Sequence, residues 1–564
     1  MSDRVSIATV CLSGTLDDKL VAVASAGFDG VEIFENDLVA SSLSPKRIRE
    51  RCADLGLTID LYQPFRDFEA VPPDVLAANL RRAERKFDVM AELGADTVLV
   101  CSSVSPDAVD DDDLAAEQLH LLADRAADRG MRVAYEALAW GRFVDTFDHS
   151  WRIVRRAAHP ALGLCLDSFH VLSRGGDPAA IRVIPADKVF FLQLADAPRL
   201  RMDVLQWSRH HRLFPGQGAF DLTGFVGSVL ATGYTGPLSL EVFNDVFRQS
   251  DPNRTAVDAM RSLLVLKEKL GLVDLPRAPA LDGYTGTEIA THDPALRETM
   301  TALGFHRTGT GRWRQGGATL TIRTGAATRI TAVEVASTDP ERSRRRAEAL
   351  LARPDEHGVP APDGTTVAFG TLANVAGEGL LTGIDHVSLT APFDDVDQTA
   401  LFYRAVLGLT AEPEAEFAAP YGLVRSLSAS DGRVRIAHNV AMLRRGDWAP
   451  AVTDPQHIAF TTADALEAAK AMRASGARLL DIGDNYYDDL DARLAPPNLD
   501  ELRANSVLYD RDEHGEYLHF STDIFGDRVF FEIVQRVGGY LGYGVVNSPV
   551  RMAAHRRSRL RNSR

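Results

Sequence analysis

The first half of the chain alternates short apolar runs with segments of helical periodicity, and this pattern repeats eight times within residues 1–271. Such alternation predicts an α/β fold in which parallel strands are joined by helices. Eight strand–helix units in this length predict a (β/α)8 TIM barrel. The alternative, a doubly wound open sheet, is disfavoured because no Gly-x-Gly-x-x-Gly follows the first strand. The predicted strands begin near Val5, Val31, Ile59, Val98, Val133, Leu162, Val189 and Leu238, and the predicted helices lie near Leu20, Ile48, Leu80, Leu119, Trp151, Ile181, Phe225 and Met260.

The second half has a different organisation. Residues 272–282 contain two prolines and lack periodicity, which predicts a linker. Beyond it, blocks of a short strand, an acidic turn and a helix begin near Thr287, Ala332, Asp385 and Gln456, and this self-similarity indicates duplicated units. We therefore predict an α+β domain with lobes at 283–375 and 380–550, separated near Gly377. The basic residues 551–564 are expected to form a disordered, solubilising end rather than a docking site.

Bulk composition excludes several classes of protein. The net charge of −16 would repel phosphate backbones, so nucleic acid is not an expected partner. The four cysteines are scattered without a Cys-x-x-Cys motif, which argues against a disulfide framework or a zinc site. No signal peptide or membrane span is evident, so we expect a cytoplasmic enzyme with a small-molecule substrate. A homo-oligomer is compatible with this composition.

Polar residues end four successive predicted strands of the barrel. A single carboxylate there could be a strand-end cap, but three carboxylates and an amide converging without a compensating Lys would repel one another. A bound cation resolves the conflict, and hard oxygen ligands favour Mg²⁺, Mn²⁺ or Co²⁺. The predicted metal ligands are Glu136, Asp167, Gln193 and Glu241.

Three further residues lie near this predicted ring. His170 follows Asp167 by three positions and is our candidate general base; the alternative is a structural histidine. Arg66 ends the third strand, and Arg212 lies in the long loop after the seventh. Either arginine could hold a substrate carboxylate, although a solvated loop arginine is the better interpretation of Arg212 taken alone.

The barrel resembles the sugar-phosphate isomerase/epimerase superfamily, which carries metal ligands in this pattern, an Asp-x-x-His motif and a Pro-Gly-x-Gly loop. The last motif is Pro215–Gly218 in this chain. Within that superfamily, residues 63–69 and 192–196 are most similar to 3-dehydroshikimate dehydratase.

A second candidate metal site lies in the C-terminal half. His386 and His457 start two repeat units and Glu532 lies late in a strand, and two His with one carboxylate form the facial triad of non-haem Fe(II) sites. Residues 383–389, 456–459 and Asp527 to Arg536 resemble 4-hydroxyphenylpyruvate dioxygenase, a vicinal oxygen chelate protein built from paired βαβββ modules. The resemblance implies Fe²⁺ or Mg²⁺ at the triad.

Two features qualify that second resemblance. In the first lobe, Glu288 and Ala332 stand at the positions of the two histidines, which implies a lobe without metal. His519 and Ser548 replace a glutamine and an aromatic residue that are usual in the dioxygenase family, which argues against its usual substrate.

The whole chain resembles bacterial two-domain 3-dehydroshikimate dehydratases. The resemblance implies formation of protocatechuate and water by a metal-assisted elimination, with His170 and Glu136 in the catalytic set and 3-dehydroshikimate as substrate. The main alternative is a sugar or hydroxypyruvate isomerase or epimerase fused to an active dioxygenase. An abasic-site endonuclease is disfavoured because it needs a His-rich zinc cluster and a basic face. Whether the C-terminal half is a dioxygenase or a binding or stabilising module stays open.

Overall fold

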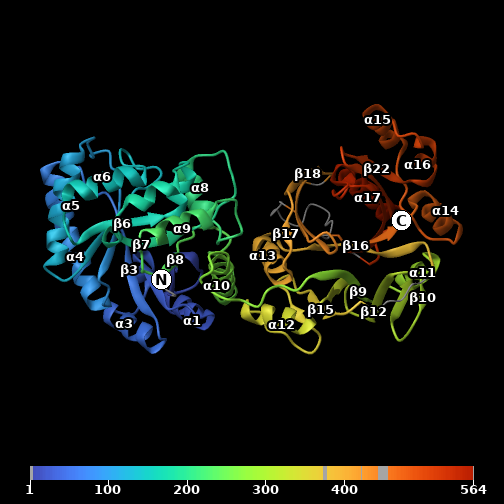
Figure 1. Ribbon diagram of the computed structural model, residues 1–564, viewed down its shortest axis with the longest axis horizontal. Helices are drawn as coiled ribbons and strands as arrows, with labels where there is room; N and C mark the ends of the chain where they lie inside the picture. Colours follow the sequence, from blue (N-terminus) through green and yellow to red (C-terminus); the bar gives the residue numbers. More distant parts are fainter. Residues whose placement is uncertain (1–3, 373–377, 421, 442–454, 527, 563–564) are drawn as a thin grey trace. The chain divides into compact units, whose positions relative to one another are not determined.

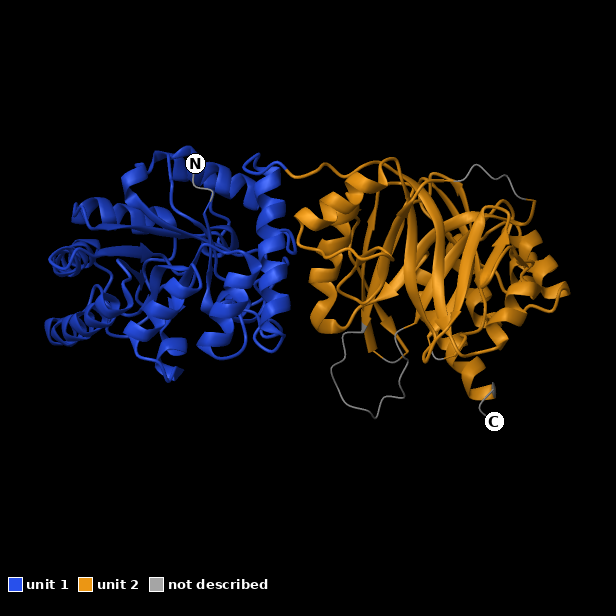
Figure 2. Ribbon diagram, turned by 90° about the horizontal axis from the view of Figure 1, so that it is seen from below, with its two compact units in different colours: residues 1–274 blue, residues 275–564 orange. Residues whose placement is uncertain are grey.

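Figure 1 shows the computed structural model, which describes residues 4–372, 378–420, 422–441, 455–526 and 528–562. The chain forms two compact units, residues 1–274 and 275–564 (Figure 2). The predicted lobe boundary at 375, Gly377 beside it, and Asp527 all lie outside the described residues.

The first unit is a closed barrel of eight strands in sequential order, and every neighbouring pair is parallel. The TIM-barrel prediction is therefore confirmed, and each strand begins within a residue of its expected position. The strands are β1 Val5–Ala8, β2 Gly30–Phe34, β3 Thr58–Phe65, β4 Thr97–Cys101, β5 Arg132–Glu136, β6 Leu162–Asp167, β7 Val189–Leu194 and β8 Leu238–Leu240.

Helices follow the strands of the barrel. The first begins at a capping box, in which Thr15 and Asp18 satisfy each other's backbone amides, and ends at Gly27 with φ 89°. The α-helices of this unit are α1 Leu16–Ala26, α2 Glu35–Ala40, α3 Pro45–Asp54, α4 Pro73–Leu93, α5 Asp112–Ala127, α6 Phe147–Ala157, α7 Ser168–Ser173, α8 Val204–His210, α9 Leu222–Ala231 and α10 Pro252–Lys269.

Some local predictions differ from the structure. The helix expected near Ile181 is the 3-10 helix η2, Pro178–Val183. The short helices α2, α7 and α8 were not expected, because six or seven residues are too few to show a helical period. Helix α7 matters for the site, since it starts directly after β6 and the Asp167 side chain caps it by accepting from the Phe169 amide.

The second unit contains two mixed sheets. The first has the order β10-β11-β12-β9-β13-β15-β14 and the second β17-β19-β20-β16-β21-β24-β23-β22, with β18 paired to β19. The first sheet and its helices comprise β9 Leu281–Thr291, β10 His306–Arg307, β11 Arg312–Gln315, β12 Ala318–Thr324, β13 Arg329–Ser337, β14 Val359–Pro360, β15 Thr366–Gly370, α11 Ala295–Ala302 and α12 Pro340–Ala349. The second sheet comprises β16 Leu381–Thr390, β17 Thr410–Ala411, β18 Ala415–Ala419, β19 Gly422–Ser430, β20 Arg435–Ala441, β21 Gln456–Thr462, β22 Leu508–Arg511, β23 Gly515–Ser521 and β24 Val529–Gly538, with helices α13 Val396–Leu407, α14 Ala465–Ala474, α15 Asp484–Leu494, α16 Leu499–Asn505 and α17 Ser548–Asn562.

The pairing of these strands reveals the duplicated units. Each of the four sequence blocks begins with one strand, and in each sheet the first strands of two blocks pair antiparallel: β9 with β13, and β16 with β21. Each of these four strands also pairs in parallel with a later strand of its own block. The parallel pairs are β9 with β12, β13 with β15, β16 with β20, and β21 with β24. The four sequence blocks therefore correspond to four copies of one strand arrangement.

The disorder expected for the basic end is wrong for the described residues. Helix α17 extends to Asn562, and Arg551 and His555 are buried. His555 Nε2 contacts the Thr522 carbonyl at 2.9 Å, and Arg551 lies over the Phe530 ring at 4.8 Å. Because Arg551, Ala554 and His555 recur at helical spacing, one face of this basic segment packs inward while its other face carries the remaining charge. Within the described part of the chain, no helix has the length and apolarity to cross a membrane.

Candidate metal centres

The four predicted ligands of the barrel lie at the carboxyl ends of β5 to β8. Glu136 and Asp167 end β5 and β6, Gln193 lies near the end of β7, and Glu241 directly follows β8. All four side chains are buried. One ligand atom each from Glu136, Asp167 and His170 lies within 4.8 Å of the others, a cluster that can hold a metal ion.

Among the carboxylates of the ring, Glu136 has an oxygen without a hydrogen-bond donor. Its Oε1 is buried without a hydrogen-bond partner and lies 3.8 Å from His170 Nε2. Burial and the charges of Asp167 and Glu241 raise its pKa well above the usual value. A buried carboxylate oxygen without a partner is costly, and a cation would satisfy it.

Arg212 corrects the assumption that no cation compensates the ring. It is 1% exposed rather than solvated, and its Nη1 donates to Asp167 Oδ2 at 2.7 Å and to Glu241 Oε2 at 3.1 Å. Burial alone would raise the pKa of Asp167, but Arg212 holds it below its usual range. For Glu241 burial outweighs Arg212 and raises the pKa to about 7. Among Glu136, Asp167, Glu241 and Arg212, with the buried Glu32 of β2 not counted, two negative charges remain unbalanced, and a divalent cation would neutralise them.

The Pro215–Gly218 motif explains how the loop holds Arg212 in this position. Asp196 accepts hydrogen bonds from the backbone amides of Gly216 at 2.9 Å and Phe220 at 3.0 Å. Its own backbone exchanges two hydrogen bonds with Leu213, next to Arg212. A Cβ at Gly218 would lie 2.3 Å from Asp196 Oδ1, so the loop cannot close with a larger residue there.

His170 presents one nitrogen to the ring. Nδ1 lies 3.1 Å from the Ala139 amide nitrogen, while Nε2 faces Glu136 and Asp167 and lies 3.3 Å from Arg212 Nη2. Burial lowers the pKa of His170 to about 3, so the imidazole is neutral at pH 7. The Trp140 ring packs edge-on against it at 5.1 Å and restricts its orientation.

Glu32 is the main residue of this site that the sequence analysis missed. It lies on β2, is fully buried, and its Oε2 accepts from Gln63 Nε2 at 2.8 Å and from Gln193 Nε2 at 2.5 Å. Its Oε1 accepts from the Ser239 hydroxyl. The amide nitrogen of Gln193 is therefore committed to Glu32, while its carbonyl oxygen accepts from the Cys165 thiol at 3.3 Å. A lone carboxylate inside the apolar run Val31–Phe34 was the available signal.

A cavity of about 790 Å³ opens at the same end of the barrel. It is lined by segments that follow β1, β2, β3, β7 and β8, and five basic side chains outnumber two acidic ones. Arg66 is among the lining residues, and its side chain makes no hydrogen bond or ion pair with any residue that the structure describes. The mouth of the barrel is therefore suited to an anionic small molecule.

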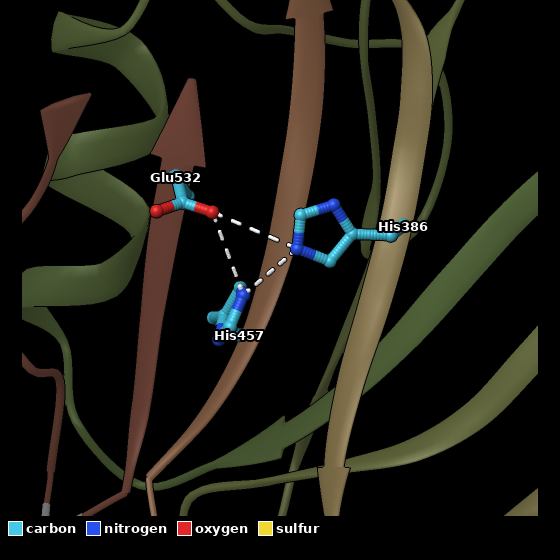
Figure 3. Close-up of side chains that lie close together, drawn as sticks. All are labelled: His386, His457 and Glu532. Atoms are coloured by element: carbon cyan, nitrogen blue, oxygen red, sulfur yellow. Dashed lines mark hydrogen bonds and ion pairs between the residues drawn. The ribbon is translucent and has the colours of Figure 1, made fainter. Parts of the chain in front are cut away.

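The second predicted cluster is assembled from three strands of the second sheet, β16, β21 and β24 (Figure 3). His386 Nε2 and His457 Nε2 lie 3.0 Å apart, and each lies 3.6 Å from Glu532 Oε2. Ligand atoms that share one ion at about 2.1 Å are separated by about 3.0–3.6 Å. The three buried side chains therefore fit a single metal ion.

Neighbouring residues orient these three side chains. Asp385 contacts His386 Nδ1 at 2.7 Å and forms a two-pronged ion pair with Arg536 at 2.8 and 2.9 Å. His519, one of the two departures from the dioxygenase pattern, contacts Glu532 Oε1 at 2.7 Å. Burial alone would raise the pKa of Glu532, but His519, together with His457 and Arg551, holds it well below the usual range. Such partners fix the tautomer and orientation of metal ligands.

In the first lobe, the residue at the position of His386 has a different environment. Glu288 pairs with Arg323 and accepts a hydrogen bond from Thr331 Oγ1 at 2.9 Å. Its carboxylate is thus engaged by protein groups on its own sheet.

Known proteins match both units in the same order. The model of the xylose isomerase-like TIM barrel family matches residues 20–266, and that of the glyoxalase/bleomycin resistance protein/dioxygenase superfamily matches residues 383–514. Two relatives named 3-dehydroshikimate dehydratase, from Pseudomonas putida and Pseudomonas aeruginosa, are 44% and 43% identical, each over 98% of both chains. A solved structure described as a xylose isomerase-like TIM barrel/4-hydroxyphenylpyruvate dioxygenase fusion protein is 42% identical, covers 99% of this chain and 100% of its own, and superimposes with a TM-score of 0.90. With this similarity along nearly its whole length, the chain belongs to the 3-dehydroshikimate dehydratase family, as a lyase whose barrel is fused to a vicinal oxygen chelate domain.

Proposed function

We propose that the barrel converts 3-dehydroshikimate into protocatechuate and water with the help of Mg²⁺, Mn²⁺ or Co²⁺. The observation that carries this proposal is the charge of the ring, where Arg212 balances only one of three buried carboxylates and Glu136 Oε1 has no partner. Glu136, Asp167, Gln193 and Glu241 would hold the cation. When bound, it supplies Lewis-acid stabilisation of the negative charge that develops on a ketone oxygen.

His170 is the proposed base. Nε2 faces the ring and lies 3.3 Å from Arg212 Nη2, which can only donate, so in the tautomer with its hydrogen on Nδ1 the buried, neutral imidazole can accept a proton at Nε2 from a carbon beside the ketone. The proton and a ring hydroxyl leave together as water, and this elimination forms a second double bond in the ring. Enolisation of the ketone then forms the third double bond and completes the aromatic ring. Aromaticity makes the overall step irreversible in practice.

Arg66 is the better placed of the two arginines to hold the substrate carboxylate. It lines the mouth cavity and has no described partner, whereas both terminal nitrogens of Arg212 are engaged by the ring, His170 and Ser208. We propose that Arg212 instead keeps Asp167 and Glu241 ionised and in place. Arg66→Lys should raise KM more than it lowers kcat, because a point charge cannot bind the carboxylate through two nitrogens.

The decisive experiment uses full-length protein stripped with a chelator. It should form protocatechuate from 3-dehydroshikimate, followed by ultraviolet absorbance, only after Mg²⁺, Mn²⁺ or Co²⁺ is restored. Undiminished activity in excess chelator would refute the metal proposal. Isomerisation of a sugar or hydroxypyruvate, without any aromatic product, would refute the dehydratase proposal.

The C-terminal triad has a separate proposed role. We infer that His386, His457 and Glu532 hold Fe²⁺ or Mg²⁺, because the three atoms fit one ion and Asp385 and His519 support two of the ligands. Metal content measured in wild type and in His386→Ala would test this, with one fewer equivalent expected in the variant.

A further inference from the structure

The loop that follows β3, residues 66–71, carries Arg66 and has a constrained backbone. Asp67 and Ala70 both lie in the left-handed region, with φ of 57° and 54°. This region is unfavourable for a residue with a Cβ, and such residues persist only where surrounding contacts impose the conformation. Residues of this kind are frequent at ligand-binding sites. The contacts that hold this loop are therefore relevant to how Arg66 meets a substrate.

Two acidic side chains of this loop accept hydrogen bonds from the same short segment after β4. Asp67 Oδ1 accepts from the Val104 amide at 2.9 Å. Glu69 Oε1 accepts from the Ser103 amide at 2.7 Å and from the Tyr135 hydroxyl at 3.0 Å. Glu69 is 2% exposed and Tyr135 is fully buried, so water does not readily replace these bonds when one partner is removed.

The partners of Glu69 adjoin a proposed metal ligand of the barrel. Tyr135 directly precedes Glu136 on β5. The amide of Ser102, the neighbour of Ser103, donates to the Glu136 carbonyl at 2.8 Å. Through one carboxylate oxygen, Glu69 therefore connects its own loop to the strand end that presents this ligand.

Arg66 and the metal ring are placed to act on one ligand. Burial and then the charges of Arg212 and Arg66 lower the pKa of His170, so Arg66 lies within electrostatic reach of the ring. Under the proposed function, 3-dehydroshikimate spans both places, with its carboxylate at Arg66 and its ketone at the cation. The rigid six-membered ring of the substrate fixes the distance between these two groups. The protein must present Arg66 and the cation at a matching distance.

We propose that Glu69 is a positioning residue that sets the spacing between Arg66 and Glu136, and thereby selects ligands whose carboxylate and metal-binding oxygens lie across one rigid ring. This inference rests on the proposed roles of Arg66 and of the metal ring. Burial raises the pKa of Glu69 to about 7, and its Oε2 is buried without a hydrogen-bond partner among the described residues. The hydrogen bonds at Oε1, rather than the charge, are what hold the spacing.

The test compares ligands that span the site with fragments that do not, through competitive inhibition of the dehydratase reaction of the full-length protein. Protocatechuate carries a carboxylate and two adjacent oxygens, catechol only the oxygens, and benzoate only the carboxylate. In Glu69→Ala the inhibition constant of protocatechuate should rise about tenfold to a hundredfold, because misalignment removes the advantage of binding both groups at once. The constants of catechol and benzoate should stay within about threefold of wild type, which would also show that both ends of the site are intact.

Matched variants separate the possible outcomes. Glu69→Gln keeps an oxygen that can accept both hydrogen bonds and should leave all three constants close to wild type. Tyr135→Phe should raise only the constant of protocatechuate. Tyr234→Phe removes a comparable buried hydroxyl, which donates to the Pro237 carbonyl at 3.0 Å ahead of β8, and should change none of them.

Two results would overturn the inference. One is an equal rise for all three ligands in Glu69→Ala, which would make the residue merely structural, and the other is no rise for any of them. Failure of the proposed function looks different, because protocatechuate and benzoate would then bind Arg66→Gln as well as they bind wild type.

Discussion

Replacing Glu32 by alanine tests whether this carboxylate positions the barrel's metal ligands. The side chain accepts hydrogen bonds from the buried amides of Gln63 and Gln193 and from the Ser239 hydroxyl. Without it, two buried amide donors lose their acceptor, and each such loss costs about 1–3 kcal/mol. We therefore expect Glu32→Ala to lower the free energy of unfolding of the barrel by about 2–6 kcal/mol. We also expect it to weaken cation binding about 10–100-fold, the usual effect of losing a residue that orients a metal ligand.

Glu32→Gln is the matched control for this prediction. Its carbonyl oxygen can accept from both amides while its NH₂ group donates to Ser239, so the hydrogen bonds survive and only the charge is removed. We expect cation affinity within about threefold of wild type, measured by competition with a metal-binding dye, with chemical denaturation reporting stability. If Glu32→Gln lost as much affinity as Glu32→Ala, the charge and not the hydrogen bonds would matter, and the positioning argument would be wrong.

Four further outcomes are expected. Glu136→Ala should abolish turnover and barrel metal binding, and retention of either would contradict its role as a ligand. His170→Ala should keep the metal but lose at least ~100-fold in kcat; an unchanged kcat in a folded variant would make this histidine structural. His386→Ala should lose the C-terminal metal and keep most dehydratase activity, whereas a loss as complete as that of Glu241→Ala would show coupled sites. Burial lowers the pKa of His438 to about 3, so the neutral form is favoured on folding and stability falls as pH drops from 6.5 towards 3, by about 1.4 kcal/mol per pH unit. His438→Phe should flatten that dependence in denaturation curves, and equal slopes for both proteins would contradict this.

The sequence predicted what depends on repetition and on strand ends. Apolar runs predicted the barrel strands, and polar residues at the ends of β5 to β8 predicted the candidate ligands, because the ends of parallel strands in a barrel lie at one face. The triad followed from histidines at equivalent places in two repeats. In both cases the fold turns a regular position in sequence into a common position in space.

Residues that act through folded loops or across several strands were not predictable in the same way. The loop of Arg212 returns to the ring only because Asp196 binds its backbone, and nothing in the local sequence indicates that return. The partners of Glu32 come from β3, β7 and β8, so its role appears only when the barrel closes. The burial of Arg551 was missed because the high content of basic residues in 551–564 indicated disorder. The helical spacing of Arg551, Ala554 and His555, which places them on one buried face, was not considered.

Arg212 also has a consequence for how the enzyme is assembled. Arg212 already forms ion pairs with two of the carboxylates, Asp167 and Glu241, so β6 and β8 can come together before any metal binds. We therefore expect the barrel to fold without its proposed metal and to bind the ion afterwards. Folding would then not select which ion enters, and a less effective metal could be exchanged for a better one without unfolding.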